Sequence, residues 1–183
     1  MEERRINQTT LQAQLSALIM VPFIVGAWVI AVSLYGIEFL NGRDNIWTIV
    51  SCIAMLGTMI PHELIHALGW MISAGKKRNE MKISIKLPFG ASIRFYGDMK
   101  VSHFIFGLLL PFIITSLIPV CVGIIIGNFY VLLYGSMLAL TCGSDILQYF
   151  LCCKYYNKTC YDPGVTGIIV KGVEINSRPF LLV

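Results

Sequence analysis

Four stretches that lack Asp, Glu, Lys and Arg limit what this sequence can fold into. They cover residues 6–37, 45–61, 101–144 and 146–153. An α-helix of about 20 residues crosses the hydrocarbon core of a bilayer, which is about 30 Å thick. Only 13% of the residues are charged, which is about half the proportion typical of soluble domains. These stretches therefore predict an α-helical integral membrane protein.

We predict about four transmembrane helices, at residues 14–36, 46–72, 104–127 and 129–152. The long uncharged stretch in the second half of the chain divides at Gly127-Asn128, a pair that is typical of turns. The first helix is longer than the apolar core of a signal peptide, so we expect it to be retained. No repeat or low-complexity linker interrupts the sequence, which predicts a single membrane domain over residues 1–183.

The basic residues fall almost entirely on one side of this predicted layout. All 14 Lys and Arg residues except Arg43 lie in the N-terminal segment, in the loop between the second and third helices, or in the tail. The positive-inside rule assigns that side to the cytoplasm, so both termini are predicted to be cytoplasmic. Contact with anionic membrane lipids on that side explains the net charge of +4. No nucleic-acid partner is therefore expected.

Residues 81–97, MKISIKLPFGASIRFYG, follow a different period from the rest of the chain. Apolar and polar residues alternate on both sides of Pro88-Phe89-Gly90, which indicates a β-hairpin with one basic face. The tail, at residues 164–175, could add a third strand after a turn at Asp162. We therefore expect a small cytoplasmic β-hairpin or three-stranded sheet. It either caps the helices and rests on lipid headgroups, or offers an edge that pairs with an extended substrate segment.

Within the second predicted helix, residues 62–66 read His-Glu-Leu-Ile-His. Residues four apart lie on one face of a helix, so the imidazoles of His62 and His66 can reach a single ion. Glu63 points about 100° round the helix and suits an acid/base group beside the metal. Charged groups are costly in hydrocarbon unless they are compensated. The pattern predicts a Zn²⁺ site with Glu63 as its catalytic group; the alternative is a polar cluster that joins helices by hydrogen bonds.

A catalytic zinc ion usually has three protein ligands and one open position. Glu63 and Asp145 are the only acidic residues within the four predicted helices. His62 and Asp145 each lie about 16 residues into helices that run in the same direction, so both are roughly 24 Å from the outer edge. This shared depth predicts Asp145 as the third ligand. The alternative is an Asp that hydrogen bonds to a neighbouring helix or to a ligating histidine.

The motifs HELIHALG, at residues 62–69, and GSDIL, at residues 143–147, resemble those of site-2-protease-like intramembrane zinc metalloproteases. The arrangement resembles more closely a small, mostly bacterial family of membrane zincin peptidases, with a basic extended loop and an LLLPF-type third helix. This resemblance implies the ligands and the acid/base named above, in a bacterial cell membrane. Ile65 and Ile146 stand where site-2 proteases usually have Gly, which places the chain outside that core group.

The predicted function is zinc-dependent hydrolysis of peptide bonds in or near the membrane. The substrate would be a transmembrane or membrane-associated protein, and Glu63 would take a proton from water and pass it to the leaving amine. One alternative is a zinc transporter, and another is a structural or chaperone partner that binds zinc without turnover. The variant Glu63→Gln discriminates between them, because it should abolish hydrolysis and leave zinc bound.

Overall fold

The apolar stretches form long helices in the computed structural model, which describes residues 3–6, 12, 15–40, 44–86, 90–163 and 168–172. Helix η1 (Ser16–Met20) leads into α2 (Val21–Tyr35), and α3 (Asn45–Ala74) follows the short η2 (Ile37–Leu40). After the hairpin, α4 (Val101–Pro111), the π-helical η4 (Phe112–Leu117) and α5 (Ile118–Ile125) follow one another without a break. Among the described residues, three single helical stretches are long and apolar enough to cross a membrane: Ser16–Tyr35, Asn45–Ala74 and Val101–Ile125.

The fourth predicted span is broken. Helix α6 (Phe129–Thr141) is followed by α7 (Gly143–Cys152) and η5 (Cys153–Tyr155), and the two parts are bent by 47°. A fourth span therefore exists only if this bent pair is counted as one, which the predicted continuous helix at 129–152 did not anticipate. Gly143 explains where the break lies, because a Cβ added to it would come within 2.5 Å of the carbonyl oxygen of Ser16. The missing side chain lets the start of α7 pack directly on η1.

Helix α3 is the longest element and carries most of the residues of interest. It begins at Asp44, whose side chain accepts a hydrogen bond from the backbone N–H of Ile46 at 2.8 Å. It ends at Gly75, which has a left-handed backbone conformation (φ 64°) that glycine adopts without a steric penalty. The helix runs without interruption through Pro61.

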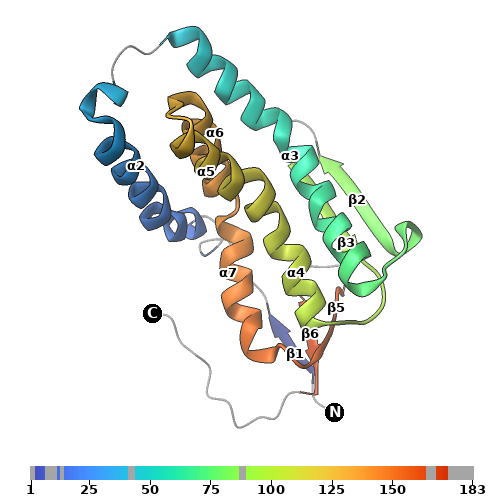
Figure 1. The fold of residues 1–183 in the computed structure, drawn as a ribbon. Coiled ribbons are helices and arrows are strands. Elements are labelled where there is room, and N and C mark those ends of the chain that lie inside the picture. The colour runs from blue at the N-terminus through green and yellow to red at the C-terminus, as the bar shows by residue number, and fades with distance from the viewer. Residues whose placement is uncertain are drawn as a thin grey trace.

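The predicted hairpin is present beside the second half of α3 (Figure 1). Strands β2 (Met81–Lys86) and β3 (Gly90–Phe95) pair antiparallel, with Ile83 opposite Ile93. The tip of the hairpin, residues 87–89, lies outside the described residues. The edge of β3 that does not pair with β2 faces α3.

The tail strand joins a different sheet from the one predicted. Strand β6 (Ile168–Lys171) pairs with β1 (Glu3–Ile6) and with β5 (Thr159–Tyr161), and β5 pairs with β4 (Met99–Lys100). The order β1-β6-β5-β4 makes a four-stranded sheet separate from the hairpin, so the prediction of a third strand on the hairpin is wrong. The bent α6–α7 pair returns the chain to the N-terminal strand, and β6 pairs there. The remainder of the predicted tail strand, 164–167 and 173–175, lies outside the described residues.

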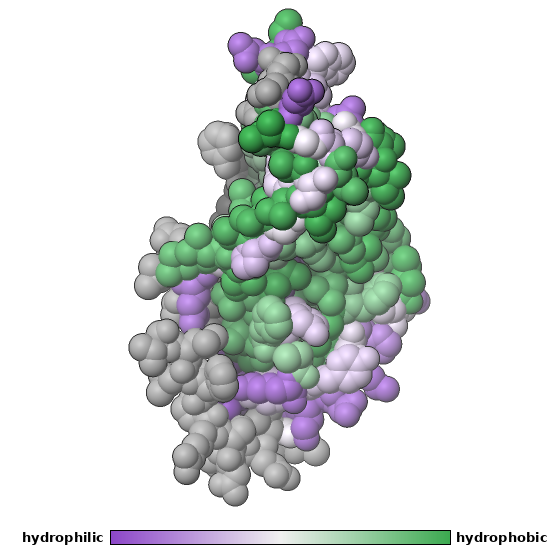
Figure 2. All heavy atoms as spheres, turned by 60° about the vertical axis from the view of Figure 1, so that its left-hand side comes forward, coloured by the Kyte–Doolittle hydropathy of each residue, from purple (hydrophilic) through white to green (hydrophobic). Residues whose placement is uncertain are grey.

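The surface is strongly divided by polarity. In Figure 2 hydrophobic residues cover the middle of the visible face, and hydrophilic residues gather at its two ends. Many large apolar side chains of α2 and α3 are exposed, including Leu34 (64%), Ile46 (67%) and Ile53 (63%). An apolar band between two polar ends matches a bilayer core with its two interfaces.

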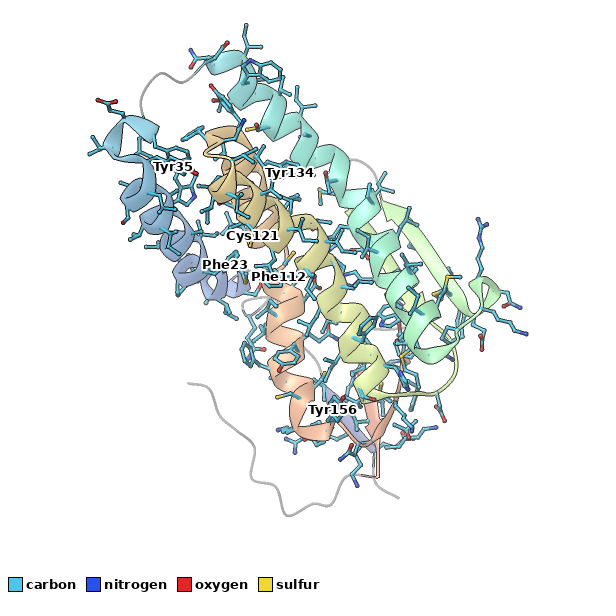
Figure 3. The ribbon with its side chains drawn as sticks, viewed as in Figure 1. Phe23, Tyr35, Phe112, Cys121, Tyr134 and Tyr156 are labelled. Atoms are coloured by element: carbon cyan, nitrogen blue, oxygen red, sulfur yellow. The ribbon has the colours of Figure 1, made fainter. Side chains whose placement is uncertain are left out.

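The buried side chains form two clusters at different levels of the helical assembly. One is built from α3, α4, α7 and the sheets, and includes Trp70, Phe104 and Val170. The other joins α2 to α5 and α6 through Ala31 and Leu132, both fully buried. Figure 3 shows that Phe23 of α2 also lies against Phe112 of η4, with ring centroids 5.5 Å apart.

Candidate metal centre

The two histidines of the motif lie on one face of α3 and point into the protein. Both are buried, with exposed fractions of 8% for His62 and 4% for His66, and their ring centroids are 5.0 Å apart. This arrangement follows from the four-residue spacing on a continuous helix. Two imidazoles are therefore presented to the same point between α3 and its neighbours.

Asp145 reaches that point from α7. It lies in the first turn after the break that separates α6 from α7. Its Oδ2 atom is 3.2 Å from Nε2 of His62 and 3.5 Å from Nε2 of His66. One potential ligand atom from each of the three residues lies within 4.8 Å of the others. The structure thus brings together the two histidines of α3 and the aspartate of α7 that the sequence nominated as ligands.

These separations fit a zinc ion. Two ligand atoms bound at 2.0–2.1 Å to a tetrahedral centre lie about 3.3 Å from each other, close to the distances from Asp145 to both rings. Two nitrogens and one carboxylate oxygen form a common donor set for catalytic zinc. The buried Nδ1 atom of His62 has no hydrogen-bond partner within the described part of the chain, so neither nitrogen of that ring is held in a competing backbone bond.

The ring of His66 is oriented by α4. Its Nδ1–H donates a hydrogen bond to the carbonyl oxygen of Gly107 at 2.9 Å, and this bond directs the lone pair of Nε2 towards Asp145. The carbonyl can approach because α3 and α4 cross at two glycines: a Cβ on Gly69 would collide with the backbone of Gly107. Sequence reasoning missed this contact, although paired glycines in apolar helices are a known signal of close helix crossing.

Trp70 packs against the imidazole ring of His66. Its ring stacks on the imidazole with centroids 6.0 Å apart and an interplanar angle of 20°. Its indole N–H donates to the carbonyl oxygen of Phe104 at 3.2 Å. Trp70 also leaves no space for a side chain at Gly107. The orientation of one candidate ligand thus depends on packing along a full turn of α4.

Glu63 lies beside the triad and is held by the hairpin. Its Oε2 atom accepts a hydrogen bond from the backbone N–H of Ile93 at 3.1 Å. Because this N–H points away from β2, the free edge of β3 faces the site. With Asp145, Glu63 brings two carboxylates next to two imidazoles in a largely apolar region, a charge distribution that a divalent cation would balance.

Two cavities adjoin these residues. The larger, about 210 Å³, lies between β3 and α7 and is lined by Glu63, His66 and Asp145 together with Arg94 and Gln148. The smaller, about 100 Å³, is reached from between α3 and α6 and is lined by Glu63, Asp145 and His62. Glu63 and Asp145 are therefore accessible from two directions, and the larger space can admit a substrate group.

His103 is not part of this constellation. Among the described residues, the only group of three or more metal-ligating side chains consists of His62, His66 and Asp145. The backbone carbonyl of His103 instead accepts a hydrogen bond from the hydroxyl of Ser73 at 3.2 Å. His103 is thus the third residue of α4, away from the candidate ligands.

Comparison with known proteins gives one family. The model of a family described as "Putative zincin peptidase" matches residues 55–161, more than half of the chain. The matched region contains both histidines, Glu63, the hairpin and Asp145. No curated protein and no solved structure matches the chain.

Proposed function

We infer that this chain, which belongs to the zincin peptidase family, is a zinc-dependent metallopeptidase that hydrolyses peptide bonds in or near a membrane. The observation that carries this proposal is the convergence of His62, His66 and Asp145 within 4.8 Å, with Glu63 beside them. The family match supports the class of enzyme. The exposed apolar band and the helices that can cross a bilayer support the membrane setting.

The chain's own residues supply a proton-transfer group and a fixed ligand set. Zinc, when bound, supplies a Lewis acid that lowers the pKa of water and polarises a carbonyl. Glu63 is placed to take a proton from the attacking water and to deliver it to the leaving amine. The N–H of Ile93 holds the Glu63 carboxylate at the edge of the cavity, so its orientation is set before substrate arrives.

The surroundings of the site support an extended polypeptide as substrate. The outer edge of β3 borders the cavity, and Glu63 occupies the N–H of Ile93 on that edge. A peptide that lies along β3 would pass Glu63 in an extended form. The site lies eight residues, or roughly 12 Å, before the end of α3, near the end at which the hairpin and the sheet lie. We therefore propose a transmembrane or membrane-associated protein as substrate, and lipids as the surrounding partner.

The location follows from the same arrangement. Basic residues gather at the sheet end of the helices, in the β2–β3 region and in the strands β1 and β6. By the positive-inside rule, we propose that this end and both termini lie in the cytoplasm. A bacterial cell membrane is proposed from the resemblance of the motifs alone. Water would reach the larger cavity from that side.

The first experiment measures zinc content and proteolysis on detergent-purified protein. Wild type should bind about one zinc ion per chain and cleave fluorescein-labelled casein, an unfolded probe. His62→Ala and Asp145→Ala should lose both properties. Glu63→Gln should keep zinc, but its rate of casein cleavage should fall at least about a hundredfold. Glu38→Gln, a change at an exposed Glu far from the site, should change neither.

Two outcomes separate this proposal from its rivals. If zinc is absent from wild type purified without chelators, the metal centre itself is refuted, and a polar cluster that joins helices remains. If zinc is bound but Glu63→Gln behaves like wild type in every assay, the peptidase is refuted, and a transporter or structural zinc protein remains.

A further inference from the structure

Gln148 lies on the face of α7 that points into the larger cavity. It is three residues after Asp145 and four before Cys152, which is fully buried, so all three fall on one stripe of the helix. The side chain of Gln148 is half-buried and lines the same cavity as Glu63 and His66. A neutral amide is thus placed at the wall of the site, one turn beyond a candidate ligand.

The Gln148 amide has no interaction partner in the described part of the protein. No hydrogen bond or ion pair engages Gln148 among the residues that the structure describes. The other polar residues of the cavity wall differ, since Arg94 and Asp162 both have interaction partners. Gln148 stands one turn after Asp145 at the wall of the cavity. Its amide donor and acceptor are therefore available to a group that enters the cavity.

The cavity is bounded on its opposite side by β3. That wall is lined by Ile93, Arg94 and Phe95. The N–H of Ile93 donates a hydrogen bond to Glu63. A peptide that lies along the free edge of β3 would present its other edge towards α7. Each of its peptide groups then offers one N–H donor and one carbonyl acceptor to Gln148.

We propose that Gln148 binds the peptide backbone of the substrate beside Glu63, with its NH₂ donating to a substrate carbonyl and its oxygen accepting from a substrate N–H. A primary amide carries the same donor and acceptor pair as a peptide group, so it recognises backbone whatever the substrate sequence. Gln148 would therefore hold the chain in place between β3 and α7. This inference rests on the proposed peptidase function.

The test compares two zinc-binding probes on the full-length, zinc-loaded protein in detergent. Acetohydroxamate binds the metal alone, whereas a succinyl hydroxamate with two peptide groups also offers backbone to the cavity. Gln148→Met keeps length and helix propensity but removes both hydrogen-bonding atoms. It should weaken the peptide hydroxamate about tenfold, as expected for the loss of two hydrogen bonds, and leave the Kd of acetohydroxamate unchanged.

Two further variants make the result specific. Gln148→Glu keeps the length, loses the amide donor and places a carboxylate opposite the substrate carbonyl. It should therefore also reduce the preference for the peptide hydroxamate, and it carries the test if the Met variant misfolds. Phe150→Leu changes a side chain that is 58% exposed on the same helix and should behave as wild type.

The failures are distinguishable. If both Gln148 variants keep the full preference for the peptide hydroxamate while acetohydroxamate binds normally, the role of Gln148 is overturned and the peptidase proposal stands. If acetohydroxamate fails to bind wild type, the metal centre is absent and both proposals fall. If the variants also lose zinc, Gln148 supports the fold of the site and does not bind substrate.

Discussion

At the candidate metal centre, His66 and Glu63 are fixed by hydrogen bonds to the backbone of neighbouring elements. At the opposite end of the helices, contacts between aromatic rings and between small residues join the elements, together with hydrogen bonds such as that from Tyr35 to the carbonyl of Ile124. His66 is bonded to the Gly107 carbonyl of α4, and Glu63 to the Ile93 N–H of β3. Each polar group of this site region thus depends on the position of another element. A shift of α4 or β3 would reorient a functional group directly.

The other region, which we call the aromatic end, consists of α2, η2 and the adjoining parts of α5 and α6. Trp28 packs edge-on against Phe129 at 5.2 Å, and Tyr35 stacks on Phe39 at 5.7 Å. One of its close helix contacts involves Gly135, where a Cβ would lie 2.8 Å from the backbone N of Val120. The ring contacts are weakly directional. Hydrogen bonds from Trp28 to the hydroxyl of Ser136 at 3.1 Å and from Tyr35 to the carbonyl of Ile124 at 2.7 Å add to them, and neither involves a candidate ligand.

The two regions are expected to differ in what a displacement of their elements changes. Apolar packing tolerates small displacements at a cost in stability alone, but a ligand set tolerates displacements of only about 0.5 Å. We therefore expect changes in the site region to alter zinc binding and stability together. Equivalent changes at the aromatic end should alter stability only.

The largest effect is expected from Gly107→Ala. The added methyl group would overlap the ring of buried Trp70, so α4 must move away from α3 and take the Gly107 carbonyl away from His66. Zinc affinity should fall about 10- to 100-fold through the loss of this supporting bond, and unfolding free energy by about 1–3 kcal/mol through overpacking. Zinc titration and thermal unfolding in detergent measure the two. Unchanged zinc affinity would show that the carbonyl does not position His66.

The matched variant at the aromatic end is Gly135→Ala. Its methyl group would press on the backbone and side chain of Val120, which should cost a similar 1–3 kcal/mol. Zinc affinity should stay within twofold of wild type, because no candidate ligand touches this contact. The same two measurements apply. A parallel loss of zinc would mean that the two regions behave as one unit and that the proposed division is wrong.

A smaller effect is expected where α3 meets α6. The hydroxyls of Thr58 and Tyr134 are hydrogen bonded at 2.7 Å, one turn of α3 before His62. Tyr134→Phe removes this bond alone, so it should cost about 1 kcal/mol of stability and leave zinc affinity unchanged. Thr58→Val also removes the bond that the Thr58 hydroxyl donates to the carbonyl of Ala54 at 2.7 Å, so its effect should be equal or larger. A double variant with an effect equal to that of Thr58→Val would confirm the shared bond.

The smallest effect concerns the turn between α3 and the hairpin. Glu80 accepts a hydrogen bond from the backbone N–H of Lys77 at 2.7 Å, and this bond, helped by nearby Lys76, lowers the pKa of its carboxyl below the ordinary 4.5. The contribution of this bond to stability is therefore fully present above pH 4.5, and it is lost as the pH falls through the lowered pKa of Glu80 in the folded state. The difference in Tm between wild type and Glu80→Gln should be small at neutral pH and disappear at low pH. A constant difference would exclude this titration as its cause.

Several features were readable because they depend on local spacing. The apolar stretches predicted long helices, alternation at residues 81–97 predicted the β2–β3 hairpin, and the His62–His66 spacing predicted two imidazoles on one face. Equal depth in two helices was enough to nominate Asp145 as a partner of the histidines. Each of these inferences follows from the rise and period of a helix or a strand.

Other features came from contacts between segments distant in the sequence. The break before Gly143 depends on η1, and the partner of β6 is β1, more than 160 residues away. A tail of alternating residues carries no information about which edge it will meet, so the predicted third strand was assigned to the wrong sheet.

The sequence by itself determined the composition of the site and the kind of helices that carry it, because residue types and their periods are local properties. Only the tertiary structure decided how that site is held. It brought the carbonyl of Gly107 to His66, the N–H of Ile93 to Glu63, and the amide of Gln148 to the cavity wall. Backbone groups are the same in every residue, so their role as partners appears only when the packing of α4, β3 and α7 fixes where they point.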